Sequence, residues 1–93
     1  MNIAQKNKLE EFIKNNNITF EKGRRNTDSV ALSGYALSLG MNTVGDLEKL
    51  IDVLCPKADW EYSRELERVF KYASDNNYGN WWDSQEAKNS YKL

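Results

Sequence analysis

The chain has 93 residues with a formal net charge of −1, and a chain of this length forms one domain around a small core, which we expect to comprise residues 1–93. The near-zero charge argues against a protein whose main task is to neutralise nucleic-acid phosphates. One cysteine, Cys55, excludes an intramolecular disulfide, and no hydrophobic run suits a signal peptide or a membrane span, so we expect a cytoplasmic protein with no membrane contact.

The first expected element is an amphipathic helix over residues 2–15. Leu9, Phe12 and Ile13 fall within one sector of its helical wheel and should dock on the core. The run Asn15 to Asn17 should end this helix, because asparagine favours local side-chain hydrogen bonds and tolerates left-handed backbone. The ITF stretch that follows has no evident strand partner, so we expect a connection there.

The second predicted helix covers residues 28–39, with Thr27 or Asn26 as its cap. Its apolar residues occupy two sectors, which is typical of a helix packed between neighbours. Gly34 costs about 1 kcal/mol relative to alanine inside a helix, and we attribute it to the close approach of another backbone. Gly40 is expected to form a left-handed C-terminal cap.

The remaining helices follow from capping residues and periodicity. The TVGD sequence that starts at Thr43 resembles a capping box and begins a helix that ends before Pro56. Asp59 should cap the next helix, with Trp60 nearly opposite its apolar stripe, and a short final helix is expected over residues 84–92. The sequence therefore predicts an all-α, compact single-domain bundle of four to five short helices.

Catalysis is poorly supported by the residue types present. The chain has no histidine, so a serine or cysteine nucleophile lacks its commonest base. Cys55 lies near a predicted helix C-terminus, where the helix dipole disfavours a thiolate, and we interpret it as a packing residue. Asp46, Glu48 and Asp52 are interpreted as a solvated helix face. We expect neither an enzyme nor a cofactor.

The segment 75–86 places oxygen-bearing side chains at several intervals of a twelve-residue calcium loop. Gly79 stands at position 5 and has no side-chain oxygen, and Asn80 stands at position 6, where glycine is normally required. We therefore expect an ordinary helix connection and assign no metal ligands. A degenerate EF-hand-like calcium module remains an alternative.

A nucleic-acid-binding accessory protein is a second alternative. The second and third predicted helices and the short glycine-containing joint between them form a candidate helix-turn-helix. The spacing suits that motif poorly, and the helix that would read DNA is acidic. A better site would combine a basic segment with exposed tryptophans on which bases stack. The residues of this alternative are Lys22, Arg24, Arg25, Trp81 and Trp82.

The aromatic segment SDNNYGNWWDSQE carries the preferred hypothesis. Adjacent residues on a helix or strand point in different directions, so one tryptophan of the pair should fill the core while the other lies near the surface. Tryptophan and tyrosine are enriched at interface hot spots.

We therefore predict a non-catalytic protein that acts by stoichiometric binding to a macromolecule, most readily a protein, as an inhibitor or adaptor. Phages and mobile elements encode such proteins, for example anti-defence inhibitors, and self-association through the same surface is a further option. The predicted partner-binding residues are Trp60, Tyr78, Trp81 and Trp82.

Overall fold

The computed structural model describes all residues from Met1 to Leu93 and contains helices but no strands. In chain order the elements are α1 (Ile3–Asn15), α2 (Arg25–Ser38), α3 (Gly45–Leu54), α4 (Tyr62–Asp75), the 3₁₀ helix η1 (Tyr78–Asp83) and α5 (Gln85–Ser90). The predicted all-α bundle is confirmed. None of its helices combines the length and the apolar character that a bilayer crossing requires.

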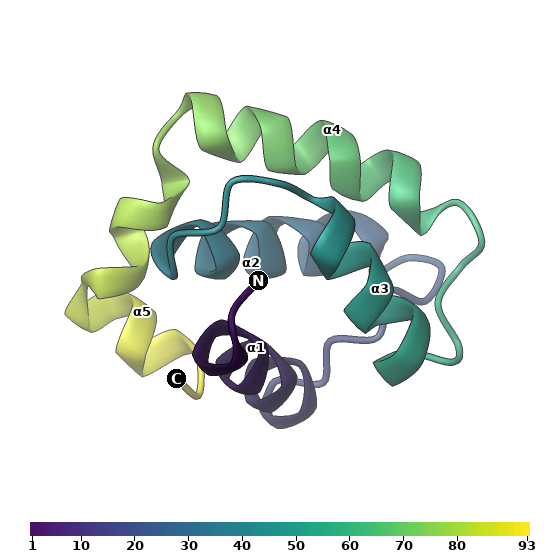
Figure 1. Ribbon diagram of the computed structural model, residues 1–93, viewed down its shortest axis with the longest axis horizontal. Helices are drawn as coiled ribbons and strands as arrows, with labels where there is room; N and C mark the ends of the chain where they lie inside the picture. Colours follow the sequence, from purple (N-terminus) through teal and green to yellow (C-terminus); the bar gives the residue numbers. More distant parts are fainter.

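The centre of the fold is a pair of parallel helices, α2 and α4 (Figure 1). Their starts are joined by hydrogen bonds from Arg25 to Glu61, at 3.3 Å, and from Asn26 to Glu65, at 2.7 Å. Helix α3 lies between them in sequence and carries the chain from the end of α2 back to the start of α4. Helix α1 crosses the lower side of the pair, and η1 and α5 cover the end at which α2 and α4 finish.

Helix α2 is buried on most of its circumference, as its two apolar sectors predict. A single cluster of 19 buried apolar residues surrounds it, drawn from every helix and from the connections. The reason for Gly34 differs from the expectation of a neighbouring backbone. A Cβ atom at Gly34 would lie 2.2 Å from Nε1 of Trp82, so the glycine makes room for an indole ring.

Two predicted helix ends are confirmed by the backbone. Helix α1 ends at Asn15, and Asn17 adopts a left-handed conformation with φ of 52°. Gly40 follows α2 with φ of 88°, the left-handed geometry that glycine adopts without strain.

The predicted caps of the three middle helices are wrong. Helix α2 begins at Arg25, before the expected caps, and its start has no side-chain cap; the buried Asp28 carboxylate accepts instead from the backbone N–H groups of Thr19 and Phe20 in the preceding loop. Helix α3 has no Thr43 cap, and Asp46, which the capping box would use, pairs with the amino group of Met1 at 2.9 Å. Asp59 accepts a hydrogen bond from the backbone N–H of Glu61 and stabilises the turn before α4.

Candidate functional site

The two adjacent tryptophans have different environments. Trp82 is 6% exposed and belongs to the core, whereas Trp81 is 37% exposed. Both lie on η1, and in a 3₁₀ helix successive side chains point about 120° apart. The prediction that one ring fills the core while its neighbour stays near the surface is confirmed.

Trp82 is the centre of an aromatic cluster. Its ring lies 5.4 Å from Phe12, 5.6 Å from Tyr35 and 4.7 Å from Tyr91, measured between ring centroids. The Phe12 and Tyr35 contacts are edge-on, the arrangement that the ring quadrupoles favour. Residues from α1, α2 and the C-terminal segment therefore hold this indole in one position.

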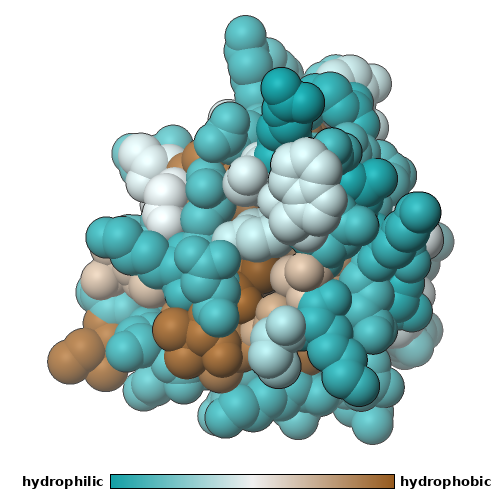
Figure 2. Space-filling view, turned by 90° about the vertical axis from the view of Figure 1, so that its right-hand side faces the viewer, coloured by the Kyte–Doolittle hydropathy of each residue, from teal (hydrophilic) through white to brown (hydrophobic).

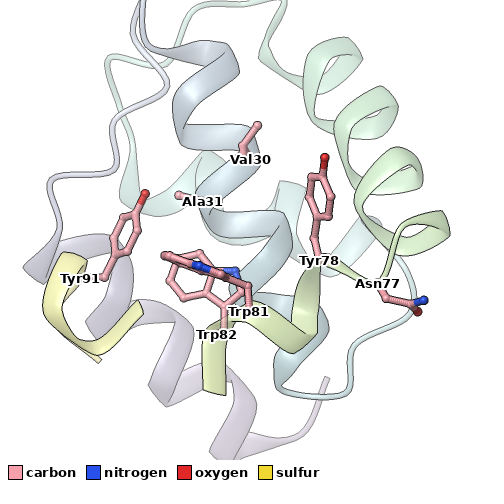
Figure 3. A pocket seen from close by; sticks show the side chains of 7 residues that line it. All are labelled: Val30, Ala31, Asn77, Tyr78, Trp81, Trp82 and Tyr91. Carbon is pink, nitrogen blue, oxygen red and sulfur yellow. The ribbon is translucent and has the colours of Figure 1, made fainter. Parts of the chain in front are cut away.

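Beside this cluster the surface is hollowed. The hollow has a volume of about 450 Å³, and we call it the aromatic hollow. In Figure 3, Tyr78 and Tyr91 stand on opposite sides, the two indoles lie between them, and α2 closes the remaining side. The lining residues are Val30, Ala31, Asn77, Tyr78, Trp81, Trp82 and Tyr91.

The rim of the hollow is apolar and carries no formal charge. Val30, Tyr78 and Trp81 are each between a third and a half exposed. Tyr72 extends the aromatic surface beyond the rim, with its ring 5.6 Å from that of Tyr78. No carboxylate, ammonium, guanidinium or thiol lines the hollow. The arrangement suits an uncharged apolar group.

Trp60, the fourth predicted partner-binding residue, does not join this site. It precedes the start of α4, whereas Tyr78 follows its end, and a helix of this length spans about 20 Å. Trp60 is 83% exposed and contacts no other aromatic ring.

Figure 2 shows the end of the molecule away from α5, where hydrophilic side chains cover most of the surface and hydrophobic ones gather in its lower part.

The basic segment of the nucleic-acid alternative is largely engaged in ion pairs. Arg24 contacts the buried Asp28 carboxylate at 3.1 Å. Arg25 contacts both Asp59 and Glu61 at 3.3 Å. Of the three predicted cations only Lys22 has no acidic partner, so a phosphate would have to compete with carboxylates already in place.

The segment of the calcium alternative is mostly helical. Asp75 ends α4, η1 occupies the middle, and Ser84 caps α5 through the backbone N–H of Ala87 at 3.1 Å. No three acidic or cysteine side chains gather in an arrangement that could hold a metal ion.

The remaining reactive groups have structural surroundings. Cys55 is buried, as its packing role predicts, and its thiol donates to the Ile18 carbonyl at 3.2 Å. Burial, with a smaller contribution from Asp28, raises the pKa of the Cys55 thiol to about 11, which makes it a poor nucleophile at neutral pH. Burial also raises the pKa of Glu48, and the Glu67 carboxylate nearby adds to this effect, so this part of the acidic face is less solvated than expected.

Sequence reasoning found three lining residues of the hollow and missed the others. Val30 lies in one of the two apolar sectors of the second predicted helix, and the presence of this second sector was the signal that could have found it. Tyr91 fell within the short final helix predicted over residues 84–92, and nothing in the sequence linked it to the hollow. Comparisons with protein-family models, with curated proteins and with solved structures found no match to this chain.

Proposed function

We propose that this protein acts without catalysis, by stoichiometric binding of a protein partner at the aromatic hollow. The single observation that carries the proposal is the hollow itself, an uncharged site of about 450 Å³ rimmed by partly exposed aromatic side chains. An inhibitor or adaptor of the kind that phages and mobile elements encode, such as an anti-defence inhibitor, is the form of this function that we favour. A cytoplasmic location is part of the proposal and is compatible with the free thiol of Cys55.

The energetics of the rim support binding. Burying a large apolar side chain fully contributes about 1.5–3 kcal/mol, and Tyr78 and Trp81 forgo part of this in the free chain. A partner group that enters the hollow would recover it with little ordering cost, because aromatic rings have few rotamers. Trp82 supports the hollow from below and is held by the core. We therefore assign Trp81 and Tyr78 to direct contact with the partner. Trp82 is assigned to the folded core that supports these two residues.

The chemistry of the lining indicates what the partner presents. A charged group would lose its hydration in the hollow and find no opposite charge there. An uncharged aromatic or large aliphatic side chain would contact rings on several sides. The hydroxyls of Tyr78 and Tyr91 can bond to polar groups beside it.

The test is affinity capture from the native host with three baits: the wild-type chain, Trp81→Ala and the matched control Trp60→Ala. Both substitutions remove one exposed indole, but only Trp81 belongs to the hollow. We expect a protein captured by the wild type and by Trp60→Ala and lost with Trp81→Ala. Capture that depends on Trp60, or on neither tryptophan, would place the interface elsewhere. Sedimentation of the wild type alone tests whether the partner is a second copy of the chain.

A further inference from the structure

The C-terminal segment, residues 84–93, supplies Tyr91 to one side of the hollow and has few polar links to the rest of the fold. Its hydrogen bonds are internal or reach Trp81, with two exceptions. The backbone N–H of Lys92 donates to Oδ1 of Asn16 at 2.9 Å, and Nδ2 of Asn16 donates to the Lys92 carbonyl at 3.0 Å. These two bonds span 76 residues of sequence, and no ion pair adds to them.

Asn16 is itself fixed where α1 ends. Its backbone N–H and its Nδ2 both donate to the Phe12 carbonyl, each at 3.1 Å. The side-chain amide thus presents one donor and one acceptor to Lys92, as a neighbouring strand would. Helix α5 has only 6 residues, too few to be stable without such outside contacts.

We infer that Asn16 is a positioning residue for the aromatic hollow: its paired bonds to the Lys92 backbone hold Tyr91 in place as one side of the hollow. Tyr91 immediately precedes Lys92, and its ring lies 4.7 Å from Trp82 and 5.7 Å from Phe12. Release of Lys92 lets the extended backbone of Tyr91 move and opens the hollow on that side. The biological meaning of this role rests on the proposed function, but the structural role does not.

The experiment compares three variants with the wild type by NMR. Asn16→Ala removes both bonds. Lys92→Pro removes the Lys92 donor while leaving Asn16 and the end of α1 intact, and the extended conformation of Tyr91 suits a residue before proline. Asn15→Ala is the matched control, since Asn15 lies beside Asn16 and its side chain makes no hydrogen bond.

We expect hydrogen exchange of the Lys92 amide to become about tenfold faster, or more, in Asn16→Ala, because its only acceptor is gone. The nuclear Overhauser contacts between the Tyr91 and Trp82 rings should weaken in both Asn16→Ala and Lys92→Pro and stay unchanged in Asn15→Ala. Ring contacts that persist in both variants would show that packing alone holds Tyr91 and would overturn the inference. Loss in Asn16→Ala with no weakening in Lys92→Pro, which keeps the Nδ2 bond to the carbonyl of residue 92, would also overturn the inference, because the two bonds would then not act as a pair.

These measurements use the free protein, so their outcome is independent of affinity capture. A failed capture leaves the positioning role intact, and persistent ring contacts leave the binding proposal intact. Once a captured protein is available, Asn16→Ala should weaken its binding by about tenfold, the effect of losing one typical hydrogen bond, while Asn15→Ala should not.

Discussion

The two ends of the α2 and α4 pair are stabilised by different means. At the end where both helices start, buried and half-buried charges are satisfied within the chain, with Asp28 accepting from Thr19, Phe20 and Arg24. At the end covered by η1 and α5, aromatic rings pack on one another and leave a hollow open. Each end also exposes a tryptophan. Exposure alone therefore does not define a site, because Trp60 has no aromatic neighbour whereas Trp81 borders an apolar hollow.

The largest effect is expected at the aromatic end, from Trp82→Ala. The indole is buried among four other rings, and truncation of a large buried aromatic costs about 3–5 kcal/mol. Urea unfolding followed by circular dichroism measures this loss. A loss below about 1 kcal/mol would mean that the aromatic end contributes little to the fold.

The next effect is expected at the polar end, from Asp28→Ala. The substitution leaves the backbone N–H groups of Thr19 and Phe20 without their acceptor, and Phe20 is fully buried. We expect a loss of about 2–3 kcal/mol in the free energy of unfolding, since an unsatisfied buried donor costs about 1–3 kcal/mol. Asp28→Asn, which keeps one acceptor oxygen, should lose less. Equal stability of Asp28→Ala and the wild type would refute the role of this carboxylate.

A smaller loss is expected from Gly34→Ala. Alanine favours the helix by about 1 kcal/mol, but its Cβ would lie 2.2 Å from Nε1 of Trp82, and overpacking of this kind costs about 1–3 kcal/mol. We expect a net loss of about 1 kcal/mol in the wild-type background. In the Trp82→Ala background the clash is absent, so the same change should be neutral or stabilising. Additive effects in this double-mutant cycle would mean that the glycine serves another contact.

The helices could be predicted from the sequence because their apolar residues recur with helical periodicity and their ends carry asparagine, glycine or proline. The starts of α2, α3 and α4 could not, because caps such as those expected at Thr43 and Asp59 depend on where neighbouring charges lie. Asp28 shows the reason. Its carboxylate binds the preceding loop, a contact that only the folded chain creates.

The candidate site was predictable in part. The different environments of Trp81 and Trp82 follow from local geometry alone, whereas which ring is buried depends on the fit of Trp82 against Gly34. The hollow forms only because Val30 and Tyr91, from two other parts of the chain, pack beside the aromatic segment. No local sequence pattern predicts that these residues come together.

The smallest effect on stability belongs to Trp81→Ala, and this variant tests the central claim most directly. The measurement is titration calorimetry of the captured partner against the wild type and Trp81→Ala, with a thermal melt of each preparation. We expect a melting temperature close to that of the wild type, with less than about 1 kcal/mol lost, and binding weaker by at least about 2 kcal/mol, the value that marks a hot spot. Unchanged affinity in Trp81→Ala, or a melting temperature lowered as far as in Trp82→Ala, would contradict the assignment of Trp81 to binding and Trp82 to the fold.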